Sequence, residues 1–175
     1  MLDLRKYIRD VPDFPKKGIV FKDITTLIKE PTAFRKAIDD LAERFRADEI
    51  DKILGVESRG FIFAAALAYR WDKGLILARK LGKLPAEKLS QEYALEYGTD
   101  AIEIHKDAVQ PGERVLIVDD LLATGGTVEA VVKLVETLGG LVAGIGFLIE
   151  LTFLNGRERF EKYKVESLIC YDFEE

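Results

Sequence analysis

The chain has 175 residues and a formal net charge of −5, a size that fits one globular domain. An acidic chain lacks the basic surface that general binding to nucleic acid or to a membrane surface requires, so we expect neither partner. The opening segment LDLRKYIRD has no apolar signal core and no apolar run approaches the length of a membrane span, so we expect a cytosolic protein.

No internal repeat, low-complexity tract or linker divides the chain, and we therefore interpret residues 1–175 as a single domain. The lone cysteine, Cys170, can form no internal disulfide, and together with the lone histidine, His105, it is too little for a zinc cluster. We interpret Cys170 as a buried structural thiol and assign no metal ligand among the side chains.

The first 25 residues predict a short helix followed by the segment VPDFPKKGIVFKDITT, whose prolines favour extended or turn backbone. We expect this segment to lie over a sheet rather than within it. A helix is predicted after Pro31, because apolar residues recur there at three- and four-residue spacing: Phe34, Ile38, Leu41 and Phe45.

Short runs rich in Ile, Val and Leu then alternate with helical patterns. The runs predict strands buried on both faces at residues 52–56, 74–78, 114–120, 143–150 and 165–170. A helix is predicted between the third and fourth runs by Val128, Val131, Val132, Val135 and Leu138, and it should stop at Gly139 and Gly140. This alternation indicates an α/β fold with a mostly parallel central sheet flanked by helices. Residues 84–105 have no single period, and we expect a hairpin or a long mobile excursion there.

The segment RVLIVDDLLATGGT is the strongest functional signal in the chain. A fully apolar strand leads to Asp119 and Asp120, and a loop of small residues then opens a helix, which is the edge where open parallel sheets bind ligands. Glycine backbone, threonine hydroxyls and the helix N-terminus form a cradle for a phosphate, and the two carboxylates suit the hydroxyls of an attached sugar. The alternative is that the carboxylates only cap the helix and the glycines only turn the chain. A Walker loop is excluded, because no Gly-Lys-Ser/Thr follows.

These residues resemble the phosphoribosyl pyrophosphate signature of the type I phosphoribosyltransferases. Further segments resemble those of the adenine-using members of that family, in the same order: PDFPKKGIVFKDIT, GVESRGFIFAAALA, ARKLGKLP and EYALEYG. One departure is Leu81, where many relatives have proline. The resemblance implies transfer of a phosphoribosyl group from phosphoribosyl pyrophosphate to adenine, with AMP and pyrophosphate as products, Mg²⁺ as cofactor and a homodimeric assembly. It also implies an N-terminal hood over residues 1–25 and a flexible hairpin loop over residues 84–105 that closes over the reacting centre.

The resemblance assigns roles to individual residues. It implies that Asp119 and Asp120 bind the ribose hydroxyls. It implies that the loop binds the 5-phosphate through Ala123, Thr124, Gly125, Gly126 and Thr127. The residues that it implies for pyrophosphate binding are Glu57, Ser58, Arg59, Gly60, Arg79, Lys80 and Lys83. It also implies a cis peptide near Glu57 and Ser58. Val20, Phe21 and Lys22 correspond to the base-binding hood, where Phe21 stacks on adenine. Glu96 corresponds to the carboxylate that handles the purine's proton, with Tyr97 beside it in the loop; Glu96, Arg59, Asp119 and Asp120 form the predicted catalytic set.

Each assignment has a plainer alternative from the residues alone. Arg59 and the lysines can be solvated charges on ordinary turns, Phe21 can belong to a core stripe, and Glu96 can be an exposed glutamate. Two other functions also stay open: the same reaction on xanthine, guanine or hypoxanthine, and a regulatory protein that senses phosphoribosyl pyrophosphate and binds nucleic acid.

Overall fold

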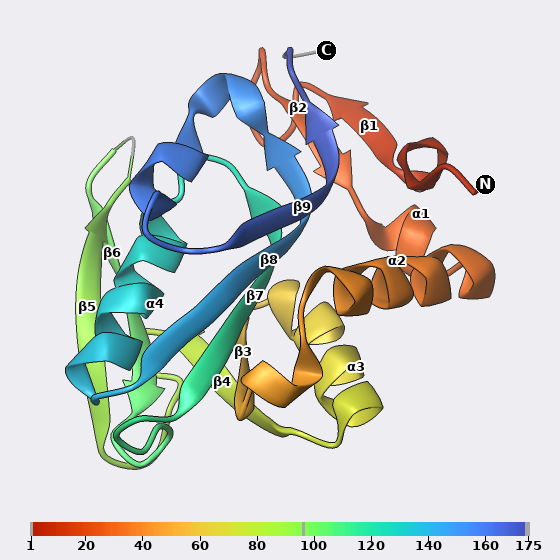
Figure 1. Ribbon diagram of the computed structural model, residues 1–175. Helices are drawn as coiled ribbons and strands as arrows, with labels where there is room; N and C mark the ends of the chain where they lie inside the picture. Colours follow the sequence, from red (N-terminus) through yellow and green to blue (C-terminus); the bar gives the residue numbers. More distant parts are fainter. Residues whose placement is uncertain (1, 96, 174–175) are drawn as a thin grey trace.

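The computed structural model describes residues 2–95 and 97–173, and in this part of the chain seven strands form one central sheet (Figure 1). Their order across the sheet is β5-β6-β4-β3-β7-β8-β9. The strands are β3 (Lys52–Val56), β4 (Gly74–Lys80), β5 (Lys88–Ala94), β6 (Thr99–His105), β7 (Arg114–Leu122), β8 (Leu141–Leu151) and β9 (Val165–Tyr171). All five predicted strands are confirmed, and they pair in parallel from β4 to β9.

Helices cover both faces of the sheet, as an α/β fold requires. The described helices are α1 (Thr25–Ile28), α2 (Pro31–Arg44), α3 (Gly60–Trp71) and α4 (Gly126–Thr137), with short 3-10 turns η1 (Leu4–Tyr7), η2 (Ala47–Glu49), η3 (Thr152–Leu154) and η4 (Gly156–Phe160). In Figure 1, α2 and α3 lie on one side of the sheet and α4 lies on the other. No helix in the described ranges is long and apolar enough to cross a membrane.

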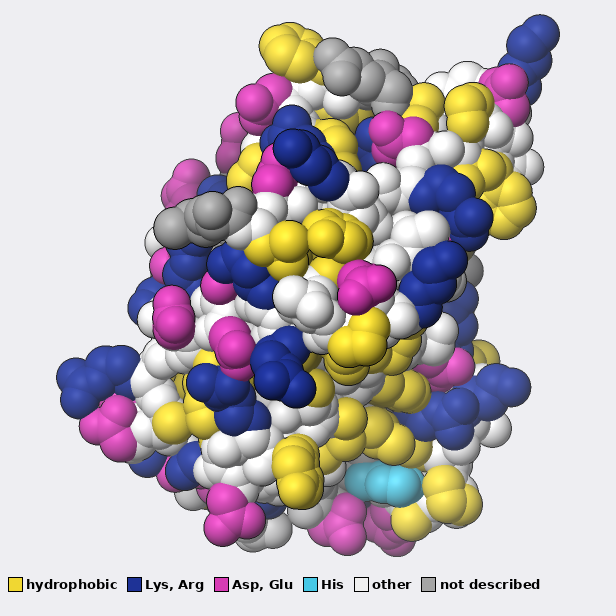
Figure 2. Space-filling model, turned by 90° about the vertical axis from the view of Figure 1, so that its right-hand side faces the viewer, with side chains coloured by type: hydrophobic (Ala, Val, Ile, Leu, Met, Phe, Trp, Pro, Cys, Tyr) yellow, Lys and Arg dark blue, Asp and Glu magenta, His cyan; other side chains and the backbone are white. Residues whose placement is uncertain are grey.

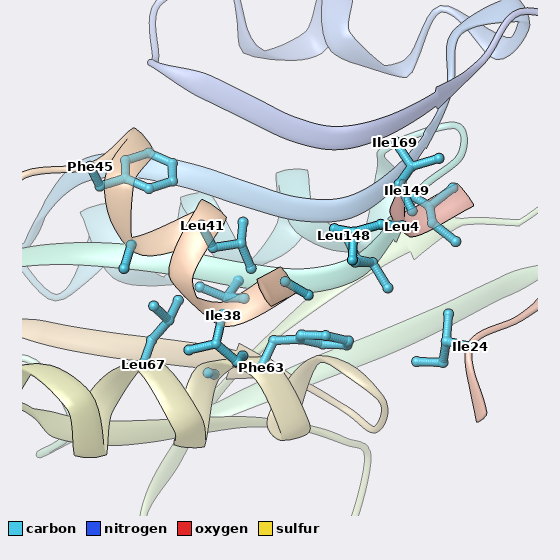
Figure 3. Close-up of a cluster of buried hydrophobic side chains, with 14 of the residues drawn as sticks. Leu4, Ile24, Ile38, Leu41, Phe45, Phe63, Leu67, Leu148, Ile149 and Ile169 are labelled. Carbon is cyan, nitrogen blue, oxygen red and sulfur yellow. The ribbon is translucent and has the colours of Figure 1, made fainter. Parts of the chain in front are cut away.

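Strand β7 divides the core, because alternate side chains of a strand point to opposite faces. Leu116 and Val118 pack with α2 and α3 in the cluster of Figure 3, whereas Val115 and Ile117 pack with α4. Burial on both faces is therefore confirmed for β7. It is wrong for β4, where Leu75 and Leu77 are 41% and 39% exposed, because α3 packs mainly on β3 and β7. It is also wrong for β9, where of residues 165–170 only Ile169 is buried and Cys170 is half-buried, because β9 is an edge strand.

The N-terminal segment lies outside the central sheet, as predicted. Strands β1 (Arg9–Pro12) and β2 (Val20–Asp23) pair antiparallel in a separate sheet, which we call the hood. The hood stands beside the ends of β8 and β9 in Figure 1. Residues 84–105 contain the antiparallel hairpin β5–β6, one of the two predicted outcomes, and β6 pairs with the end of β4. That pairing extends β4 to Lys80, two residues beyond the apolar run that predicted it.

Candidate active site

Two loops meet at one edge of the sheet because β3 and β7 are parallel neighbours. The first follows β3 and leads through Arg59 into α3, and the second follows β7 and leads into α4. The two lie in close contact, since a Cβ added to Gly60 would be 2.8 Å from Oδ1 of Asp119. A side chain at position 60 would therefore push α3 away from the carboxylate.

The two aspartates at the end of β7 have different surroundings. Burial, and then the charge of Asp120, raise the pKa of Asp119 well above its usual value. Asp120 is only 5% exposed, and its Oδ2 forms no hydrogen bond within the described residues. Nε of Arg59 lies 2.9 Å from this oxygen and forms an ion pair with it, without the alignment of a hydrogen bond. Since buried polar atoms are almost always satisfied, Oδ2 is suited to accept a hydrogen bond from a ligand.

The loop after β7 has the geometry of an anion cradle. Gly125 has a φ of +83° and directly precedes α4, so the backbone turns there in a conformation that favours glycine. Thr127 lies in the first turn of α4, where free backbone N–H groups and the helix dipole attract an anion. Arg159 of η4 connects this loop to α4, because it donates to the carbonyl of Thr124 at 2.7 Å and pairs with Glu129 at 2.8 Å.

The hood is held over this edge by polar and aromatic contacts. The guanidinium of Arg59 lies over the ring of Phe21, with Cζ 4.8 Å from the ring centroid, and Phe14 meets the same ring edge-on at 5.2 Å. Within the hood itself Asp23 of β2 pairs with Arg9 of β1, and the pKa of Asp23 is lowered to about 2 by hydrogen bonds from Thr25 and then from Arg9. Arg59 therefore joins the predicted base site at Phe21 to the predicted ribose site at Asp120.

The predicted pyrophosphate residues form a second cluster beside β3. Oε2 of Glu57 accepts from the backbone N–H of Lys80 at 2.7 Å and lies 3.4 Å from Nε of Arg79. The peptide between Glu57 and Ser58 is cis, as the resemblance implied. Arg79 and Lys80 follow the predicted strand 74–78 in the sequence; the structure places both within β4, because β6 pairs with them.

The remaining cations are less tied to the site. Lys80 pairs with Asp100 of β6 at 3.6 Å, whereas Lys83 is exposed in the turn that follows β4. A bound anion would therefore compete with Glu57 for Arg79 and with Asp100 for Lys80.

The tip of the hairpin reaches the loop that joins the two strands of the hood. Tyr97 is 76% exposed, and Nζ of Lys16 in the hood lies 4.8 Å from the centroid of its ring. Lower in the hairpin, the hydroxyl of Tyr93 lies 3.2 Å from Asp100, and a Cβ at Gly126 would be 3.5 Å from the carbonyl of Ala94. Glu96, the predicted proton carrier, lies outside the described residues.

Four residues of this region were not found from the sequence. Phe14 and Lys16 lie in a proline-rich segment without periodicity, and Asp100 and Arg159 are charged residues in segments where solvation is the ordinary expectation. Their contacts join segments far apart in the chain, so no local signal indicates them. Among residues 2–95 and 97–173, no group of three or more His, Cys, Asp or Glu side chains could hold a metal ion.

Comparison with known proteins identifies a close group of relatives. The model of the Phosphoribosyl transferase domain family matches residues 25–174. The adenine phosphoribosyltransferase of Brachyspira hyodysenteriae is 56% identical over 170 residues, which cover 97% of this chain and 100% of the relative.

Solved structures agree with the sequence comparison. The adenine phosphoribosyltransferase of Thermoanaerobacter pseudethanolicus is 57% identical with a TM-score of 0.93, and the match covers 96% of this chain and 98% of that one. The enzyme of Saccharomyces cerevisiae, solved with an imino-altritol bisphosphate and adenine, is 41% identical with a TM-score of 0.89, over 94% of this chain and 96% of that one.

Proposed function

The chain belongs to the phosphoribosyl transferase domain family, and from this membership and its site we infer that it transfers the 5-phosphoribosyl group of phosphoribosyl pyrophosphate to adenine, releasing pyrophosphate and forming AMP. The observation that carries the proposal is the position of Arg59 between Phe21 and Asp120. It makes a base site, a ribose site and a phosphate cradle contiguous along one edge of the sheet.

The 5-phosphate binds in the loop from Ala123 to Thr127. Its oxygens take the backbone N–H groups at the start of α4, while Gly125 lets the backbone turn around them. Asp119 and Asp120 accept hydrogen bonds from the two ribose hydroxyls. Oδ2 of Asp120 is available for this, because it accepts no hydrogen bond from the described residues.

Positive charge develops on the ribose ring as pyrophosphate departs, so anions near the sugar and cations around the leaving group lower the barrier. Asp119 and Asp120 supply the anions. Arg59 exchanges its contact with Asp120 for the leaving group, and Arg79, Lys80 and Lys83 surround it further along the edge. Backbone donors of Ser58 and Gly60, with Glu57 orienting Arg79 and Lys80, complete the pyrophosphate site.

Adenine stacks on Phe21, where the guanidinium of Arg59 now lies. Backbone groups of Val20 and Lys22 in β2 read the edge of the base, and Glu96 of the hairpin accepts or holds the proton that the purine sheds. Closure of residues 84–105, with Tyr97 against the hood, excludes water from the activated sugar.

Mg²⁺ fits this site as a partner of the substrate rather than of the protein. The described residues offer no cluster of ligands, and Mg²⁺ in phosphate sites is characteristically held by phosphate oxygens with one or two carboxylates. When bound, it supplies positive charge to the leaving pyrophosphate. Asp119 and Asp120 are the carboxylates placed to contact its water shell or the hydroxyls beside it.

We further propose a single domain over residues 1–175 that assembles as a homodimer in the cytosol. The exposed apolar side chains Leu75 and Leu77 on β4 and Tyr69 on α3, which is 92% exposed, are candidates for the contact between subunits. Figure 2 shows hydrophobic side chains gathered near the histidine on one face. Leu75, Leu77 and His105 line a hollow of about 330 Å³.

The proposal is tested by incubating the protein with Mg²⁺, phosphoribosyl pyrophosphate and labelled adenine, and measuring AMP and pyrophosphate. We expect the two products in equal amounts, and we expect their formation to stop when Mg²⁺ is chelated. Pyrophosphate without AMP would show hydrolysis rather than transfer and would reject the proposal.

A further inference from the structure

The ring of Tyr171, at the end of β9, contacts two cations from different segments. Nζ of Lys22 in β2 is 4.1 Å from the ring centroid, and Cζ of Arg5 in η1 is 4.8 Å from it. Arg5 also donates to the backbone carbonyl of Cys170. Tyr171 is only 8% exposed and the side chain of Lys22 is buried, so this cation meets the ring where water is largely excluded, which strengthens cation–π attraction; Arg5 is exposed.

Lys22 is a buried charge that this arrangement stabilises. Its side chain is 4% exposed and pairs with Oδ1 of Asp10 at 2.7 Å, across the register pair that joins β1 to β2. A buried ammonium is costly unless its lost hydration is replaced. Asp10 and the ring of Tyr171 provide that replacement, and together they attach β2 to the end of the central sheet.

The attachment acts on the side of β2 that faces away from the base site. Side chains alternate along a strand, so Lys22 and its neighbour Phe21 point to opposite faces of β2. On one face Lys22 contacts Tyr171; on the other Phe21 contacts Arg59. A shift of Lys22 therefore moves the ring of Phe21 and the backbone on both sides of it.

We propose that Tyr171 is a positioning residue for the base: by holding Lys22 it sets the distance of strand β2 from the sheet, and so determines affinity for adenine. This inference rests on the proposed function, in which β2 binds the base. The site for the 5-phosphate is built on β7–α4, and the pyrophosphate site on β3–α3 and the end of β4; none of these elements supplies a residue to the attachment. Tyr171 should therefore affect one substrate and not the other.

The test compares Tyr171→Leu, which removes the ring, with Tyr171→Phe, which keeps it. We expect Tyr171→Leu to raise KM for adenine about tenfold, with KM for phosphoribosyl pyrophosphate unchanged, and Tyr171→Phe to stay within about twofold of the wild type. Tyr163→Leu is the matched control, because the hydroxyl of Tyr163 donates to Glu136 on α4 and its ring packs against the core cluster on the α4 side of the sheet. An equal effect on both substrates, or equal effects of the Leu and Phe variants at Tyr171, would overturn the proposal.

Lys22→Met provides the second arm and decides the matter if Tyr171→Leu does not fold. It removes the charge but keeps the length of the side chain, and it should raise KM for adenine selectively. Adding Tyr171→Leu to Lys22→Met should change KM for adenine little further, because residues that act through one contact are not additive. Full additivity would refute the coupling. If the wild type forms no AMP the proposed function fails, whereas AMP formation with an unmoved KM for adenine rejects only this inference.

Discussion

Replacing the aspartates at the end of β7 should separate catalysis from folding. Asn has the shape of a protonated Asp but carries no charge, so Asp119→Asn and Asp120→Asn remove anions from the site with little change in volume. In the proposed complex each carboxylate accepts a hydrogen bond from a ribose hydroxyl. A hydrogen bond to a charged group contributes about 2 kcal/mol, or about 30-fold in affinity.

The double variant should therefore lose about 10²- to 10³-fold in kcat/KM for phosphoribosyl pyrophosphate, since adjacent residues are not fully additive. Folding should respond differently, and its sign follows from the pKa of Asp119. Because burial and Asp120 raise that pKa, the folded protein binds a proton more tightly than the unfolded chain does. Stability from this group is complete below the unfolded pKa of about 3.9 and is lost as pH rises through the folded pKa.

At neutral pH the wild type has therefore lost stability because Asp119 is buried beside Asp120, and Asp119→Asn removes the ionisable group that causes this loss. The ligand-free Asp119→Asn protein should be at least as stable as the wild type at pH 7, and its stability should depend less on pH above about 4. Steady-state kinetics with saturating adenine and thermal unfolding without ligand measure the two quantities. A variant that unfolds at neutral pH, or one that keeps wild-type kcat/KM, would refute the assignment.

Three further changes test other parts of the site. Gly125→Ala should weaken the binding of both phosphoribosyl pyrophosphate and AMP, measured by calorimetry. Gly112→Ala, at a similarly positive φ far from the cradle, should weaken the binding of neither. Loss of pyrophosphate binding alone would show that the loop binds a different phosphate from the one proposed. Glu96→Gln should lower kcat by about 10² or more with affinity for phosphoribosyl pyrophosphate unchanged, and wild-type kcat with rate-limiting chemistry would leave Glu96 no role in proton transfer. Leu77→Glu should convert a dimer to monomers in sedimentation, and an unchanged mass would place the subunit contact elsewhere.

The sheet was predictable because its central strands are short runs of consecutive apolar residues, the pattern that burial on both faces requires. Residues 115–118 of β7 are apolar on both faces, and both faces are covered. The helix after them was predictable for a similar reason, since one stripe of valines faces the core. The end of β4 was not, because Arg79 and Lys80 are charged and become part of a strand only through pairing with β6.

The site was predictable where a motif places several groups within a few residues, as at Asp119 to Thr127. It was not predictable where contacts join distant segments. The position of Arg59 between Phe21 and Asp120 depends on how the hood folds over the sheet, and the pairing of Lys16 with Tyr97 depends on both the hood and the hairpin. These contacts involve polar or exposed side chains, whose sequence pattern is that of ordinary surface residues.

A competition among bases tests the transfer of the phosphoribosyl group to adenine most directly. The protein is given Mg²⁺, a limiting amount of phosphoribosyl pyrophosphate and equal concentrations of adenine, guanine, hypoxanthine and xanthine, and the nucleotides formed are identified by mass. We predict AMP as the dominant product with pyrophosphate released in equal amount. Dominance of another nucleotide, or binding of phosphoribosyl pyrophosphate with no nucleotide formed, would contradict it.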